Sequence, residues 1–222
     1  MNQKRKRKGT ASVWLLVGFL LWTAAVRTVD VQAIGPQGSA VGFAALNRGF
    51  HDLTGVHMSL YTITDWLGLV PFGVALGFAC LGLVQWIRRK QIRQVDFDLL
   101  ALGGFYLTVM AAYVFFEQIV INYRPILIEG VLEASYPSST TLLVLCVMPT
   151  AWMQLRVRIR KNRLRRCVAV LIFGFVVFMV LGRLVSGVHW LTDIIGGILL
   201  SAGLILMYDA FCGLEPNMLE AE

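Results

Sequence analysis

Six long apolar stretches divide the 222-residue sequence. A helix needs about 20 predominantly apolar residues to cross the hydrocarbon core of a bilayer. Each stretch approaches or exceeds that length and is bounded by charged or turn-forming residues. The six are Ala11–Val26, Trp66–Trp86, Leu99–Ile121, Ser138–Leu155, Cys167–Leu184 and His189–Phe211. Together with a mean hydropathy of +0.70, they predict an all-α integral membrane bundle of about six transmembrane helices, with residues 1–222 as a single domain.

The first stretch follows basic residues, as the apolar part of a signal peptide would. No small-residue cleavage site follows it cleanly, so we interpret it as a retained helix. The loop after it, roughly Arg27–Asp65, mixes apolar residues with a glycine- and proline-containing segment. We expect this loop to form short interfacial helices over the outer mouth of the bundle.

Lysine and arginine are distributed unevenly between the loops. Five precede the first stretch, four follow the second and seven follow the fourth, which together are 16 of the 20 basic residues. The positive-inside rule places these loops, and therefore both termini, in the cytoplasm. Anionic lipid headgroups account for the net charge of +7, so no nucleic-acid partner is expected. The four cysteines lie in or at the ends of apolar stretches, without metal-ligand or disulfide spacing.

The opposite, outer half of the chain contains only four basic residues, all arginines: Arg27, Arg48, Arg124 and Arg183. A charge near a bilayer usually faces a protein interior or an aqueous cavity, which makes each a candidate functional residue. The alternative is an arginine that reaches the outer headgroups, and for Arg27 and Arg48 this alternative stays open.

Two short segments place polar groups near this outer surface. Asn122-Tyr123-Arg124-Pro125 ends the third stretch, and Tyr136-Pro137-Ser138-Ser139-Thr140-Thr141 opens the fourth. The N-terminus of a helix offers unpaired amide donors and a partial positive charge, which suit an anion. Ordinary serine or threonine capping explains the same hydroxyl residues without a ligand.

A third segment, Gly182–Asp193, joins the last two stretches. His189 and Asp193 are four residues apart, so on a helix the carboxylate can accept a hydrogen bond from the imidazole. That pairing would leave the other ring nitrogen free as a base or nucleophile. The alternative is a structural His–Asp pair, although Arg183, six residues earlier, favours chemistry.

In this order, the three segments resemble the motifs of the type-2 phosphatidic acid phosphatase superfamily, K-x6-R-P, P-S-G-H and S-R-x5-H-x3-D. That superfamily contains membrane lipid phosphatases and vanadium haloperoxidases, and the resemblance covers about Glu117–Asp193. It implies that His189 attacks phosphorus and forms a phosphohistidine, and that Asp193 orients it. It also implies phosphate binding by Arg124, Arg183 and Ser138, with Ser139 adjacent, and requires no metal or cofactor.

Three departures from the pattern concern the chemistry. Glu117 replaces the lysine of the first motif, Ser139 and Thr140 replace the glycine and histidine of the second, and Gly182 replaces the serine of the third. The missing histidine is the superfamily's general acid, whose loss typically costs roughly 10²–10⁴ in rate. An alkoxide leaving group has a conjugate acid pKa of about 16, whereas the phosphate monoester released by a diphosphate has a relevant pKa of about 6 and leaves unprotonated. We therefore expect a polyprenyl diphosphate to be preferred over phosphatidic acid.

The role of Glu117 stays open at this point. It can point away from the site, pair with an outer arginine, act as a substitute acid if burial raises its pKa, or hold a divalent cation. His51 and His57, in the loop before the second stretch, can fold over the site and replace the acid, or be ordinary surface histidines.

The expected function is hydrolysis of a phosphate or diphosphate headgroup of a membrane lipid on the extracytoplasmic side of the cell membrane. A different class of function stays open: a catalytically weakened relative that binds or moves a phosphorylated lipid, or that supports a partner enzyme. A transporter has less support, since the chain lacks paired interrupted helices. The oligomeric state and the lipid tail are not determined by the sequence.

Overall fold

The structure is a computed structural model that describes residues 3–213. Its described part is built from α-helices joined by short 3-10 turns and irregular loops, without a named strand. The α-helices are α1 (Gln3–Thr28), α2 (Ala44–Thr54), α3 (Met58–Leu67), α4 (Val70–Arg89), α5 (Phe97–Gln118), α6 (Ser139–Arg158), α7 (Asn162–Val185) and α8 (Leu191–Cys212). Six helical segments within the described residues are long and apolar enough to cross a membrane, which confirms the predicted all-α membrane fold.

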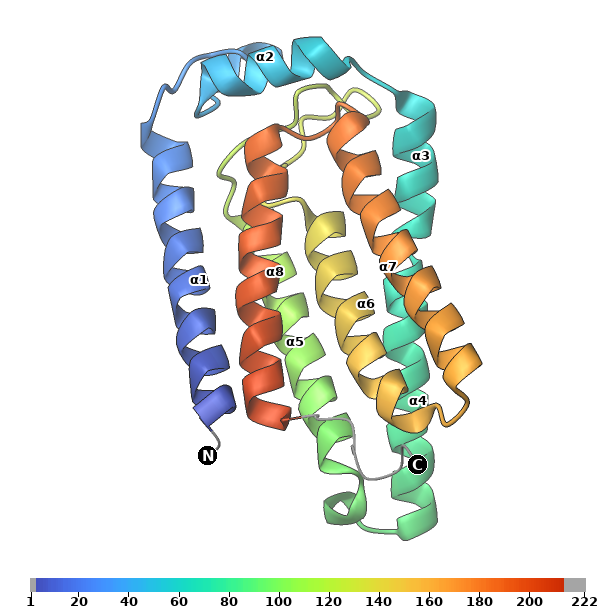
Figure 1. The fold of residues 1–222 in the computed structure, drawn as a ribbon. Coiled ribbons are helices and arrows are strands. Elements are labelled where there is room, and N and C mark those ends of the chain that lie inside the picture. The colour runs from blue at the N-terminus through green and yellow to red at the C-terminus, as the bar shows by residue number, and fades with distance from the viewer. Residues whose placement is uncertain (1–2, 214–222) are drawn as a thin grey trace.

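The most buried of the six membrane-spanning segments is α6, at the centre of the bundle. It packs against α4, α5, α7 and α8, while α1 packs on the outer side of α8 (Figure 1). The apolar residues of α6 contribute to two separate core clusters, one shared with α1, α5 and α8 and the other with α7. The polar start of α6 is thereby surrounded by the ends of the neighbouring helices.

Small residues let α1 lie close to α8. A Cβ atom added to Gly203 would lie 2.7 Å from the Leu16 side chain, and the Ser12 hydroxyl donates to the Gly203 carbonyl at 2.8 Å. Lys8 forms an ion pair with Asp209 at 2.6 Å, at the end of the bundle where α1 begins and α8 ends. These contacts place the first and last described helices side by side over their whole length (Figure 1).

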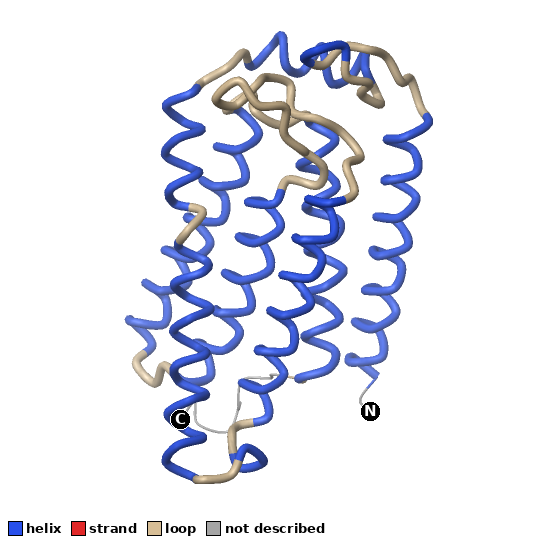
Figure 2. Tube along the Cα trace, turned by 180° about the vertical axis from the view of Figure 1, so that it is seen from behind, coloured by secondary structure: helices blue, strands red, loops and turns tan. Residues whose placement is uncertain are grey.

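The basic segments gather at this same end. The start of α1, the end of α4 and the turn between α6 and α7 all lie there (Figure 1). At the opposite end, α2 and the irregular loop of residues 119–138 lie across the tips of the helices, which Figure 2 shows from behind. The charge asymmetry expected from the sequence is therefore a real asymmetry of the fold, and the cytoplasmic assignment of the basic end stays a prediction.

Several predicted boundaries differ from the observed ones; the first helix, for example, begins at Gln3 rather than at Ala11. The second span begins eight residues before Trp66, because α3 and α4 form one membrane-crossing segment, Met58–Arg89, interrupted at Gly68. The third helix ends at Gln118 rather than Ile121. The last helix begins at Leu191, so His189 precedes it. The expected interfacial helix over the mouth is α2.

Candidate active site

The loop of residues 119–138 folds back over the end of the bundle. It contains Arg124, one of the residues predicted to bind phosphate. The Arg124 amide donates to the Glu133 carbonyl at 3.0 Å, and the Ser135 amide donates to the Asn122 carbonyl at 2.9 Å. The Trp190 indole donates to the Tyr123 carbonyl at 2.8 Å. The first two bonds hold the loop together, and the third joins it to the turn between α7 and α8.

His189 lies in that turn and is 3% exposed. Its Nε2 atom is 3.1 Å from Nη2 of Arg183, and its Nδ1 atom is 3.2 Å from the Ser135 carbonyl oxygen. Because a guanidinium only donates and a carbonyl only accepts, the geometry requires a proton on Nδ1 and a lone pair on Nε2. Burial, followed by the charges of Arg124 and Arg183, holds the pKa of His189 well below its ordinary value. The imidazole is therefore neutral, as a nucleophile must be.

Asp193 supports this turn rather than bonding the imidazole directly. Its Oδ2 atom is 3.7 Å from His189 Nδ1, too far for a hydrogen bond, and accepts instead from the Trp190 amide at 2.9 Å. The Asn122 side chain is 3.4 Å from Oδ1. The direct His–Asp hydrogen bond expected from the four-residue spacing is absent, because His189 lies outside the helix that begins at Leu191.

Arg183 and Arg124 are both buried, at 1% and 9% exposure. Arg183 lies 3.4 Å from Asp65, and Arg124 lies 3.0 Å from Glu133. Nη1 of Arg124 and Nε of Arg183 are buried without a hydrogen-bond partner among the described residues. Buried donors of this kind are costly unless an acceptor completes them, and an oxyanion has the matching charge and lone pairs.

A polar cavity of about 710 Å³ adjoins these arginines. Arg124, Arg183, Ser139, Thr140 and Glu117 all line it, so these five motif positions are brought together. Ser138 does not line the cavity, because it is fully buried and accepts from the Thr141 hydroxyl at 3.0 Å. His189 does not line the cavity, but its Nε2 atom contacts Arg183, which does.

Whether a residue lines the polar cavity decides which residues can replace the missing general acid. Thr140 faces the cavity, so the superfamily's histidine position points into the site. Neither His51 nor His57 lines it. The His51 ring is tilted against the Trp190 ring, with 5.6 Å between the ring centroids, and Nε2 of His57 lies 2.9 Å from the Thr54 carbonyl oxygen. Glu117 also lines the cavity, and among residues 3–213 it has no ion-pair partner. Within residues 3–213, no group of three or more acidic, histidine or cysteine side chains is arranged to hold a metal ion.

Three site residues were missed by the sequence reasoning. Asp65 and Glu133 line the cavity beside Arg183 and Arg124, and the Tyr61 ring lies next to both guanidinium groups. All three come from segments interpreted as loops. Two arginines buried in an apolar protein are expected to have carboxylates nearby. The sequence does not identify these carboxylates, because the fold determines which ones lie close to the arginines.

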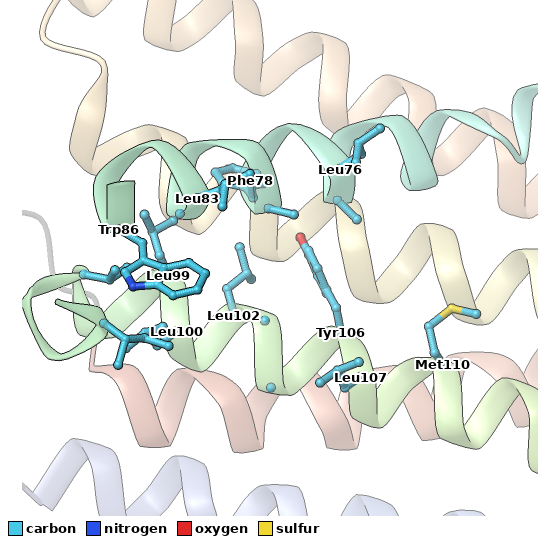
Figure 3. Close-up of a pocket in the computed structure, with 17 residues that line it drawn as sticks. Leu76, Phe78, Leu83, Trp86, Leu99, Leu100, Leu102, Tyr106, Leu107 and Met110 are labelled. Atoms are coloured by element: carbon cyan, nitrogen blue, oxygen red, sulfur yellow. The ribbon is translucent and has the colours of Figure 1, made fainter. Parts of the chain in front are cut away.

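An apolar cavity, also of about 710 Å³, lies between α4 and α5 (Figure 3). Leu76 and Met110 are at one end, and Trp86 and Leu99 are at the other. On α4, Leu76 follows by one turn Phe72 of the polar cavity, and on α5, Met110 lies one turn from Tyr113 of the polar cavity. The two cavities are therefore lined by neighbouring turns of the same two helices.

Comparison with known proteins bears on the family resemblance and on the fold. The sequence model of the PAP2 superfamily matches residues 103–211, from α5 to α8, which include all three motif segments. Among solved structures, the chain is similar to "the first transmembrane PAP2 type phosphatidylglycerolphosphate phosphatase from Bacillus subtilis", with a TM-score of 0.52 and 21% identity over 93% of this chain and 98% of that chain. At that identity the likeness concerns the fold. No curated protein sequence matches the chain significantly.

Proposed function

We propose that the chain, a multi-pass membrane protein whose residues 103–211 match the sequence model of the PAP2 superfamily, is a member of that superfamily and hydrolyses a lipid diphosphate through a phosphohistidine at His189. The observation that carries the proposal is the contact of 3.1 Å between Arg183 and Nε2 of His189, at the inner wall of the polar cavity. The Nε2 lone pair of His189 can act as a nucleophile, and it lies beside a buried guanidinium group whose hydrogen bonds are incomplete. A site that only bound phosphate would need the arginines but not the imidazole.

The chemistry follows from the protonation state. A phosphate in the cavity offers Arg183 a charged acceptor in place of the imidazole, which frees the Nε2 lone pair. That lone pair forms the N–P bond while the bond from phosphorus to the bridging oxygen breaks, and the departing monophosphate keeps the electron pair. Ser135 accepts from Nδ1–H throughout, and water then cleaves the N–P bond to give inorganic phosphate.

Thr140 supports the preference for diphosphates. It occupies the position of the superfamily's general acid and lines the cavity, yet a threonine hydroxyl is not acidic near neutral pH. An alkoxide therefore leaves slowly from this site, whereas a phosphate monoester leaves without protonation. The substrate class that fits is a lipid whose headgroup is a diphosphate.

The apolar cavity between α4 and α5 is evidence for a substrate with a long hydrocarbon tail (Figure 3). It begins one helical turn from the polar cavity and is lined by side chains such as Phe78, Leu83 and Leu102. A polyprenyl diphosphate with its headgroup beside the arginines would place its tail there. Such a substrate at the end opposite the basic loops lies at the extracytoplasmic side of the cell membrane, with both termini in the cytoplasm.

A second candidate function is binding of a phosphorylated lipid without hydrolysis. Asp65, Glu117 and Glu133 line the same cavity, and their negative charges reduce its affinity for an anion. This observation favours a protein whose catalysis is weakened. The neutral, correctly protonated imidazole favours the enzyme.

The test is phosphate release by the detergent-purified protein from prenyl diphosphate, prenyl monophosphate, phosphatidic acid and phosphatidylglycerol phosphate. We expect release chiefly from the diphosphate and none after His189→Ala. Comparable turnover of phosphatidic acid would contradict the diphosphate preference. Binding of these lipids without release from any of them would favour the second candidate.

A further inference from the structure

Helix α3 lies outside the segment matched by the superfamily model but against the functional end of α7 (Figure 1). The two helices meet at Gly182, where an added Cβ atom would lie 2.7 Å from Cγ2 of Thr64. Thr64 is fully buried, and its hydroxyl donates to carbonyl groups of its own helix at 2.9 and 3.0 Å. The glycine that departs from the superfamily pattern is therefore what lets α3 pack closely against the arginine-bearing helix.

This packing places one face of α3 against the two arginines. The Tyr61 ring centroid lies 5.0 Å from Cζ of Arg183 and 5.9 Å from Cζ of Arg124. Asp65, one turn further on the same helix, lies 3.4 Å from Arg183. One aromatic ring thus contacts both guanidinium groups, which otherwise repel each other as like charges.

We propose that Tyr61 is a positioning residue of the phosphate site, whose ring holds Arg124 and Arg183 together as one anion-binding unit. The inference rests on the proposed function, since it assigns Tyr61 to the site that binds the substrate phosphate. The negative face of an aromatic ring attracts a cation within about 6 Å, and the attraction strengthens when the pair is removed from water. Arg183 is 1% exposed and Arg124 is 9% exposed, so both contacts are largely shielded from water.

The position of Arg183 has two consequences for the reaction. In the proposed reaction its guanidinium binds the anion, and in this structure it donates to Nε2 of His189. A ring that supports Arg183 as it turns from the imidazole to the phosphate keeps the donor close to both. Loss of the ring should weaken anion binding more than it slows the chemical step, because the nucleophile itself is held by Ser135 and not by Tyr61.

The first experiment compares Tyr61→Leu with Tyr61→Phe in the full-length purified protein. The probe is orthovanadate, a tetrahedral analogue of phosphate, whose binding is measured directly by calorimetry. We expect Tyr61→Leu to weaken orthovanadate binding and raise KM by roughly tenfold, with kcat changed less, and Tyr61→Phe to keep wild-type values since it retains the ring. Wild-type affinity in a folded Tyr61→Leu protein would overturn the proposal, as would a wild-type protein that does not bind orthovanadate.

A second experiment keeps the shape of the side chain. Phenylalanine analogues with increasing fluorine substitution at position 61 withdraw electrons from the ring face while filling nearly the same volume. We expect the orthovanadate dissociation constant to rise stepwise with each fluorine. A flat series would overturn the proposal even if Tyr61→Leu failed to fold.

Leu60→Ala is the matched control. Leu60 is on the same helix as Tyr61 and packs near Gly182 of α7, so its truncation loosens the packing of α3 while leaving the Tyr61 ring in place. We expect reduced thermal stability with a near wild-type dissociation constant, and an equal loss of affinity would overturn the role of the ring. If orthovanadate binding depends on the ring but no lipid is hydrolysed, the proposed function fails and the assignment of Tyr61 to the anion site stands.

Discussion

At the scale of single residues, position 140 decides which leaving groups the site can expel. Thr140 lines the polar cavity where the superfamily pattern has its proton donor. Thr140→His should therefore restore a general acid and raise phosphatidic acid turnover by about 10²-fold, with little gain on a prenyl diphosphate. Parallel assays of both substrates test this, and Thr140→Gln is the control for size and polarity. An equal gain on the two substrates would contradict the explanation of the preference.

The protonation of His189 makes a second residue-scale prediction. Its pKa in the folded protein lies below the ordinary value of 6.5 that it regains on unfolding. Its neutral form therefore contributes fully to stability above about pH 6.5, and this contribution is lost as the pH falls toward the folded-state pKa. The difference in Tm between wild type and His189→Asn should stay constant from pH 8 to about 6.5 and shift against wild type below that. His51 and His57 are present in both proteins and cancel. A shift in favour of wild type at low pH would contradict the stated sign.

The sequence motifs predict which residues form the site, but they do not predict the hydrogen bonds between these residues. Arg124, Arg183, Ser139, Thr140 and Glu117 were expected near one another, and all line one cavity. The bond of His189 to the Ser135 carbonyl was not expected, because it depends on how the loop of residues 119–138 folds back. Ser138 is buried instead of facing the cavity, a distinction that spacing along a chain does not contain.

At the scale of elements, the close contact between α3 and α7 depends on the absence of a side chain at position 182. Gly182→Ala places a methyl group 2.7 Å from Cγ2 of Thr64 and should destabilise the protein by about 1–3 kcal/mol. Thr64→Ser removes that methyl group while keeping the hydroxyl. The double variant should therefore recover most of the loss, and the Tm of all four proteins in detergent measures the coupling. Strictly additive effects would contradict the packing explanation.

The pattern of apolar residues predicts the presence of the helices but not where each helix begins and ends. Hydropathy located all six spans, because only long helices satisfy the backbone within a bilayer. It did not detect that α3 continues into α4, because Asp65 and the hydroxyl residues of α3 interrupt the apolar pattern. Nor did it separate His189 from α8, where Trp190 and Asp193 form the cap that begins the helix.

At the scale of the whole molecule, the distribution of charge predicts the orientation in the membrane. Leu53 on α2 and Asn162 at the start of α7 are both exposed and lie at opposite ends of the bundle (Figure 1). In a variant without Cys80, Cys146, Cys167 and Cys212, Leu53→Cys should react with a membrane-impermeant maleimide in intact cells, and Asn162→Cys only after permeabilisation. The reverse pattern would place the site in the cytoplasm.

The proposed phosphoryl group on His189 can be trapped during a single turnover. The purified protein is mixed with a prenyl diphosphate, quenched within one turnover in alkali, where phosphohistidine is stable, and digested for mass spectrometry. We predict one phosphoryl group on His189 that is lost on brief acid treatment, and none in His189→Ala. Phosphate release by the wild-type protein without a phosphoryl group on His189, or release that persists in His189→Ala, would contradict the account.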